Sequence, residues 1–159
     1  MVMDVKLHKA QAVLVVESPH EEEVVTGVPL SGKAGIVVGK ALINRGEPIG
    51  PLCQKGEVRL SIVNTFLQPR QFDVEGEGRS RLLSDIDSLR YGDPCGYKRE
   101  IFELLNCTRE RGLVESYKER LVDVLAVAEG RKIIVCGLIA QAVFEWVFGV
   151  EGLRPMPIS

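Results

Sequence analysis

The stretch Ala12-Val13-Leu14-Val15-Val16 is a continuous apolar run, and it is followed directly by the carboxylate of Glu17. A valine-rich run without alternating polar residues is typical of a strand that is buried on both faces of a parallel sheet. Residues 58–63 and residues 132–136 are the candidates for a second and a third strand. The stretch before the second strand, residues 46–56, is rich in turn-forming residues.

Apolar residues recur with helical spacing in the rest of the chain. The predicted helices cover residues 80–90, 97–106, 114–125 and 138–148. Gly130 is expected to close the third helix and Gly149 to end the fourth. Strands that alternate with helices predict a parallel sheet covered on both sides. We therefore expect residues 1–159 to form one domain, a three-layer α/β/α sandwich with a short, mainly parallel central sheet.

The composition is that of an ordinary globular protein, with 45% hydrophobic and 26% charged residues in 159. The net charge of −2 gives no sign of the basic excess that dedicated nucleic-acid binders usually carry. No apolar run reaches the ~18 residues that a membrane helix needs, and the N-terminus lacks the apolar core of a signal peptide. We expect a cytoplasmic protein that does not bind a membrane.

Four cysteines stand far apart, and the chain has only two histidines, His8 and His20. No pair has metal-ligand spacing, so neither a metal, an iron–sulfur cluster nor another cofactor is expected. The cysteines are predicted to be free thiols, and Cys136, within an apolar run, is predicted to be buried and inert.

The loop after the first strand is the most informative part of the sequence. It reads Glu17-Ser18-Pro19-His20, continues with three glutamates, and then runs from Gly27 to Gly35 as a glycine-punctuated segment that opens a helix. In open α/β sheets, ligands bind beyond the carboxyl ends of the strands. Backbone N–H groups at residues 32–35 would face outward at the helix start and hold an anion. The glutamates at 21–23 are predicted to be a solvated helix start.

These segments resemble the uracil-DNA glycosylase superfamily, in which a strand ending in a carboxylate and a proline turn is followed by a G-x-P-F-x-G-x-A-G stretch. Here the matching segments are residues 16–20 and Gly27-Val28-Pro29-Leu30-Ser31-Gly32-Lys33-Ala34-Gly35. Residues 61–65 are similar to the family's second strand ending in an asparagine, and residues 132–140 to a later strand–glycine–helix element. The resemblance touches most of the chain from residue 12 to residue 148, and it is closest to divergent members with a Glu-Ser-Pro-His signature.

The resemblance implies a protein that binds a nucleobase or nucleotide, with DNA as a partner, and that hydrolyses an N-glycosidic bond. By position, Glu17 would orient water or stabilise positive charge on the sugar, and Asn64 would hydrogen-bond the edge of a flipped pyrimidine. His20, the only histidine in these loops, is a candidate general acid or a hydrogen-bond donor to a phosphate. The remaining candidate substrate-binding residues are Ser18, Pro19, Leu30, Ser31, Gly32 and Gly35.

Several alternatives stay open at this stage. Leu30 stands where the family has a stacking aromatic, and no late histidine loop is recognisable before the chain ends at residues 154–159. Both features favour a non-catalytic module that binds nucleic acid or a protein partner on the same scaffold. The alternative for Glu17 is a helix-capping or ion-paired carboxylate. The alternative for His20 is a histidine hydrogen-bonded to turn backbone, and for Asn64 it is a residue that caps the following turn. Residues 27–34 also nearly match a phosphate-binding loop, although Ala34 replaces the required hydroxyl residue.

Basic and acidic residues between positions 70 and 99 balance one another, so this stretch is predicted to be ordinary solvated surface. The basic members are Arg70, Arg79, Arg81, Arg90, Lys98 and Arg99, and the acidic members are Asp73, Glu75, Glu77, Asp85, Asp87 and Asp93.

Overall fold

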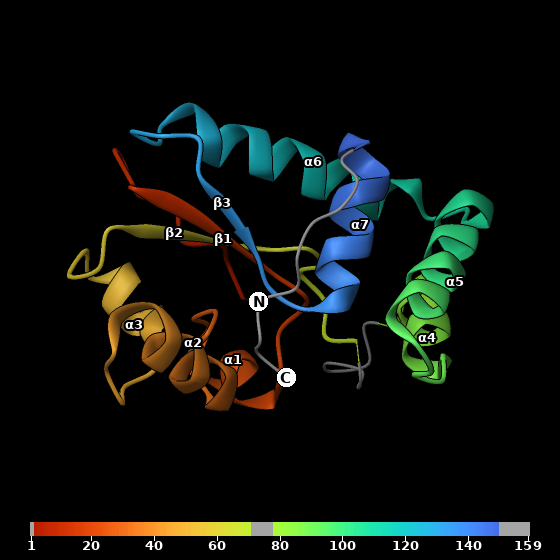
Figure 1. The fold of residues 1–159 in the computed structure, drawn as a ribbon, viewed down its shortest axis with the longest axis horizontal. Coiled ribbons are helices and arrows are strands. Elements are labelled where there is room, and N and C mark those ends of the chain that lie inside the picture. Colours follow the sequence, from red (N-terminus) through yellow and green to blue (C-terminus); the bar gives the residue numbers. More distant parts are fainter. Residues whose placement is uncertain (1, 71–77, 150–159) are drawn as a thin grey trace.

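A computed structural model describes residues 2–70 and 78–149, and within them the centre of the molecule is a parallel sheet of three strands (Figure 1). The strands are β1 (Ala12–Val16), β2 (Leu60–Asn64) and β3 (Ile133–Val135), in the order β2–β1–β3. In this register Val16 lies beside Asn64, and Val15 lies beside Val135. The carboxyl ends of all three strands therefore meet at one edge of the sheet.

The central strand β1 is buried along its whole length because both of its faces are covered. Val13 and Val15 pack into one hydrophobic cluster, and Leu14 and Val16 pack into a second cluster on the opposite face. This alternation follows from the two-residue repeat of a strand, and it explains why the run has no polar member.

Three short helices cover the face of the sheet that carries Leu14 and Val16. They are α1 (Glu21–Thr26), α2 (Lys33–Ile43) and α3 (Ile49–Gln54). Val38, Ile49 and Cys53 supply the side chains that pack against the strands. The turns between these helices bring the glycine-rich segment beside the carboxyl end of β1.

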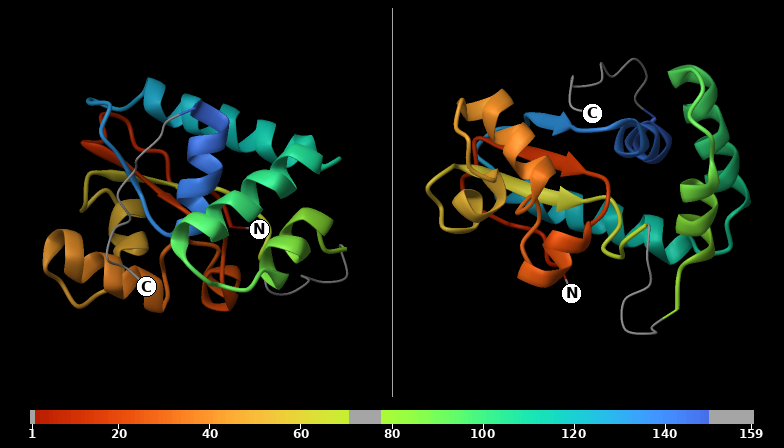
Figure 2. Two further views of the ribbon diagram at one scale, coloured as in Figure 1. Left: turned by 45° about the vertical axis from the view of Figure 1, so that its right-hand side comes forward. Right: turned by 90° about the horizontal axis from the view of Figure 1, so that it is seen from below.

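The opposite face is covered by α6, while α4, α5 and α7 lie toward the carboxyl ends of the strands (Figures 1 and 2). These helices are α4 (Arg81–Ser88), α5 (Pro94–Cys107), α6 (Arg111–Ala126) and α7 (Leu138–Phe148). Their apolar faces form one cluster with Val13 and Val15. The helix α7 begins directly after β3 and ends at Gly149, whose φ of 66° suits a glycine.

The mixed α/β class with a parallel sheet, predicted from the sequence, is confirmed, and helices lie on both faces of the sheet. The predicted bounds of β1 and α7 agree with the structure. Two predictions were wrong. The turn-rich stretch at 46–56 contains α3. The helix α6 ends at Ala126 and its cap residue, Val127, is in an ordinary right-handed conformation, so Gly130 does not close it. Propensity could not find α3 because its packing against β2 and α2 outweighs its glycine and proline.

Candidate functional site

A small cavity of about 160 Å³ opens at the carboxyl ends of the strands. Its walls come from the ends of all three strands, the turn after β1, and helices α1 and α2. They are formed by Val16, Glu17, Ser18, His20, Glu23, Leu30, Ala34, Val38, Asn64, Cys136 and Gly137. Apolar side chains therefore surround a few polar groups, which is the usual make-up of a small-molecule site.

Glu17 lies between this cavity and the start of α7. Its backbone carbonyl accepts a hydrogen bond from the Phe66 N–H at 2.9 Å, which ties the loop after β1 to the loop after β2. Its carboxylate accepts the backbone N–H of Ile139 in the first turn of α7. Gly137 precedes that helix with a φ of 92°, and a Cβ there would stand 2.6 Å from Oε1 of Glu17. A residue with a Cβ at this point would displace the carboxylate and would have to adopt a strained φ.

The electrostatic environment of Glu17 contains opposing contributions. Burial raises the pKa of the Glu17 carboxyl above its usual value, and this is the largest effect. Arg70, His20 and the Ile139 N–H act in the opposite direction and lower it. Glu17 is thus a buried carboxylate that contacts the first turn of α7, as the helix-capping alternative predicted. A pKa perturbed by burial within a cavity is typical of functional carboxylates.

Asn64 lies at the end of β2 and is almost completely buried. Its backbone is fixed on both sides: its N–H donates to Asp4 Oδ1 at 2.9 Å, and its carbonyl accepts from Arg120 Nη1 at 2.8 Å. Arg120 also pairs with Asp4 at 2.8 Å. The side-chain nitrogen Nδ2 is buried and has no hydrogen-bond partner among the described residues. Such an unsatisfied donor costs about 1–3 kcal/mol, so its presence in a cavity wall requires an explanation.

His20 and Glu23 stand at the start of α1. The His20 N–H donates to Glu23 Oε2 at 3.2 Å, because Glu23 occupies the third helical position and reaches back to the cap residue. Glu23 is therefore buried and lines the cavity, so the prediction that all three glutamates at 21–23 form a solvated helix start was wrong for this one. His20 lies close enough to Glu17 for their charges to interact.

Leu30 forms an apolar wall of the cavity and is 5% exposed. Its φ of 53° is unusual for a residue with a side chain and costs roughly 1–2 kcal/mol. Two glycines hold it there. The Leu30 carbonyl accepts the Gly50 N–H at 2.9 Å, and a Cβ on Gly35 would stand 1.9 Å from the same oxygen. Gly35 therefore shapes the cavity by allowing this contact, although it does not line it.

The carboxylate of Glu22 already occupies the start of α2. Glu22 Oε2 accepts the Lys33 N–H at 3.3 Å, and a Cβ on Gly32 would lie 2.0 Å from that oxygen. The expected outward-facing anion site at residues 32–35 is thus occupied by Glu22. Gly32, Ser31 and Pro19 are not among the residues that line the cavity, and Ser31 Oγ pairs with Thr26 Oγ1 at 2.6 Å.

The phosphate-binding-loop interpretation does not fit this geometry. Such a loop connects a strand to a helix. Here Gly27 ends the helix α1, with its N–H bonded to the Glu23 carbonyl, so no strand precedes the segment.

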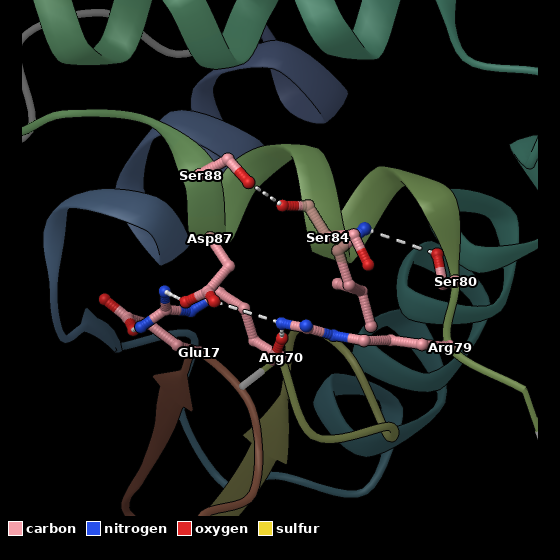
Figure 3. A network of polar contacts seen from close by, with 8 residues as sticks. Glu17, Arg70, Arg79, Ser80, Ser84, Asp87 and Ser88 are labelled. Carbon is pink, nitrogen blue, oxygen red and sulfur yellow. Dashed lines mark hydrogen bonds and ion pairs between the residues drawn. The ribbon is translucent and has the colours of Figure 1, made fainter. Parts of the chain in front are cut away.

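Arg70 was predicted to be a solvated surface residue, and this was wrong. Its side chain is only 15% exposed, and it lies between two carboxylates, with Nη1 2.6 Å from Asp87 Oδ1 and Nη2 3.9 Å from Glu17 Oε2 (Figure 3). Arg79 contacts the other oxygen of Asp87 at 3.1 Å. Charge balance alone could not reveal this arrangement, because it depends on α4 folding back over the loop after β2. The acidic residues Asp73, Glu75 and Glu77 lie outside the described residues, as do residues 154–159.

In the part of the chain that the structure describes, no group of three His, Cys, Asp or Glu residues could hold a metal ion. Within the same residues, no helix is both long and apolar enough to cross a membrane. Cys136 and Cys53 are buried, as predicted for Cys136, and burial raises the pKa of each thiol to about 11.

The cavity brings together Glu17, Ser18, His20, Leu30 and Asn64 from the predicted site. The sequence missed Glu23, Cys136 and Gly137, together with the apolar wall residues Val16, Ala34 and Val38. Comparison of the sequence with protein-family models and with curated proteins gives no match.

Proposed function

We propose that this cavity binds a single nucleobase and that Glu17 promotes hydrolysis of the N-glycosidic bond, as in the uracil-DNA glycosylase superfamily that the sequence resembles. The observation that carries the proposal is that Asn64, whose buried Nδ2 has no hydrogen-bond partner among the described residues, lines the same small cavity as Glu17. The helices on both faces of the parallel sheet are compatible with the three-layer sandwich of that superfamily.

The size and lining of the cavity favour one base over a larger ligand. Sites for drug-sized ligands usually enclose about 300–1,000 Å³, whereas this cavity encloses about 160 Å³. The apolar walls from Val16, Leu30 and Val38 suit the faces of a planar ring. A ring carbonyl that accepts a hydrogen bond from Asn64 Nδ2 would remove the cost of the unsatisfied donor.

The reaction that these groups support is a substitution at the anomeric carbon. The bond between the base nitrogen and C1′ breaks, and the base leaves with the electron pair. Water forms the new bond to C1′ and loses a proton to solvent, which restores the proton that the departing base receives. Positive charge develops on the sugar in between, and the Glu17 carboxylate, held in place by the α7 backbone, would stabilise it. His20 would donate the proton that the departing base takes up.

An activity assay tests the proposal directly. The chain is incubated with single- and double-stranded DNA that contains uracil or hypoxanthine, and abasic sites are detected after alkaline cleavage. We expect base release by the wild type, and loss of at least about tenfold for Glu17→Gln and for Asn64→Ala. Lys33→Ala, on the exposed side of α2, is the matched control and should retain activity. No release from any substrate, beside an active control glycosylase, would reject hydrolysis for these bases.

A second candidate function is base binding without cleavage. It is favoured by the hydrogen bond from Ile139 to Glu17, which gives the carboxylate a structural role, and by Leu30 at the position of the aromatic. In that case a fluorescent base analogue in single-stranded DNA would bind to the wild type without release, and Asn64→Ala would weaken binding while Glu17→Gln would not.

A further inference from the structure

Arg70 faces Glu17 but is not among the residues that line the cavity. Arg70 comes from the loop after β2 and pairs with Asp87 from α4 (Figure 3). Tyr97 from α5 lies close enough to both for their charges to affect its pKa. Glu17 is therefore surrounded by groups from four parts of the chain: Arg70, His20 in the turn after β1, Tyr97, and the Ile139 N–H at the start of α7.

Arg70 divides its guanidinium unequally between its two carboxylate partners. At 2.6 Å, the Nη1 contact with Asp87 is a charge-assisted hydrogen bond. At 3.9 Å, the Nη2 contact with Glu17 is too long for a hydrogen bond and acts only through the charge. Arg70 thus supports the negative charge of Glu17 without occupying a carboxylate oxygen.

Asp87 is itself fixed by a second cation. Arg79 Nη2 contacts Asp87 Oδ2 at 3.1 Å, and the same group donates to the Arg70 carbonyl (Figure 3). Arg79 and Asp87 therefore hold both ends of Arg70, its backbone and its guanidinium. In a side chain that is 15% exposed, little freedom remains for the guanidinium to move toward Glu17.

We propose that Arg70 is a positioning residue for Glu17 and that Asp87 keeps the guanidinium at a distance, so that the carboxylate stays charged but free to face the cavity. A bidentate Arg–carboxylate pair at this point would neutralise Glu17 and occupy the oxygens that the sugar cation needs. A neutral residue at position 70 would deprive the buried carboxylate of its largest cationic support. The observed contact of 3.9 Å between Arg70 and Glu17 lies between a bidentate pair and the absence of a cation. This inference rests on the proposed function for its purpose, but its geometry can be tested without any activity.

The test is the titration of the Glu17 side-chain carboxyl, followed by its ¹³C resonance in variants of the full chain. Arg70→Gln should shift the titration midpoint to higher pH, and Arg70→Lys should restore most of the wild-type value because the charge is kept. Asp87→Asn should shift the midpoint to lower pH, because a nearby negative charge is lost and because Arg70 is then released toward Glu17. In the Arg70→Gln background the same substitution should shift the midpoint less, because only the first cause remains. Arg81→Gln, on the same helix as Asp87, is the control and should leave the midpoint unchanged, because the Arg81 side chain is 91% exposed.

The opposite signs distinguish positioning from general loss of structure. If Arg70→Gln left the midpoint unchanged, or if Asp87→Asn moved it upward together with Arg70→Gln, the proposal would be overturned. Thermal unfolding of each variant establishes that it is folded. Where glycosylase activity is present, the acid limb of kcat/KM should follow the same shifts. If activity is absent but the carboxyl shifts appear, the positioning role stands and the hydrolytic function fails.

Discussion

The contact between Gly35 and Leu30 makes a prediction whose size follows from the structure. In Gly35→Ala, the new Cβ would stand 1.9 Å from the Leu30 carbonyl oxygen, whereas ordinary contact begins at 3.4 Å. The carbonyl would have to move by about 1.5 Å, because a backbone atom cannot rotate away as a side chain does. Such a movement would also break its hydrogen bond with the Gly50 N–H.

The free-energy terms can be compared individually. Overpacking of this kind costs about 1–3 kcal/mol, and the lost hydrogen bond costs about 1 kcal/mol. Alanine gains about 1 kcal/mol over glycine inside a helix. The free energy of unfolding should therefore fall by about 1–3 kcal/mol, which lowers the Tm by about 2–12 °C for a chain of this length.

Gly112→Ala is the matched control for this variant. Gly112 lies on the exposed side of α6, and a Cβ there meets nothing within 4 Å. Its substitution should stabilise the chain by up to about 1 kcal/mol. Both variants are compared with the wild type by urea and thermal unfolding. If Gly35→Ala were as stable as Gly112→Ala, the close approach of α2 to the Leu30 carbonyl would be refuted, and with it the account of how the cavity wall is held.

Three further predictions concern charge and burial. Burial raises the pKa of Glu17 in the folded state, so the stability that this group contributes is full below its unfolded pKa near 4.5 and is lost as the pH rises through its folded pKa. The stability of Glu17→Gln relative to the wild type should therefore increase across this pH range in urea unfolding. A constant difference would contradict the burial effect. Arg120→Ala leaves Asp4, its partly buried carboxylate partner, without a cation and should lower the free energy of unfolding by about 3–5 kcal/mol. Lys6→Ala breaks an exposed ion pair and should lower it by less than about 1 kcal/mol. Equal effects in thermal unfolding would contradict the network that Arg120 and Asp4 form at β2. The thiols of Cys53 and Cys136, buried and with pKa values of about 11, should react with a thiol reagent at pH 8 far more slowly than the two exposed cysteines; four equal rates would contradict the packing.

The sequence predicted what depends on local pattern. The run at residues 12–16 is apolar at every position and rich in valine, which is typical of a strand buried on both faces, so the sheet and the position of Glu17 at its edge could be predicted. The switch-point rule then placed Asn64 beside Glu17, because parallel strands end at the same edge. The residues Gly35 and Gly137 were visible as glycines, but the contacts that require them depend on tertiary structure.

What the sequence could not reveal are pairings between distant segments. Arg70 looked like one of many balanced surface charges, yet α4 brings Asp87 within 2.6 Å of it. Glu22 and Glu23 looked equivalent within an acidic run, but helical geometry sends one to the start of α2 and the other into the cavity. The direction of each glutamate depends on how α1 is rotated about its axis, and a helix of six residues is too short for its apolar periodicity to define that rotation.

The central claim is that Asn64 and Glu17 share a cavity that accepts a single base. It is tested most directly by following the side-chain amide resonances of Asn64 while free uracil, and then hypoxanthine, is added to the ¹⁵N-labelled chain. We expect a saturable shift of these resonances, accompanied by the backbone amides of Ser18 and Gly137, and an affinity reduced about 5- to 100-fold in Asn64→Ala. The absence of any saturable shift with either base, or shifts confined to residues away from the cavity, would contradict the account.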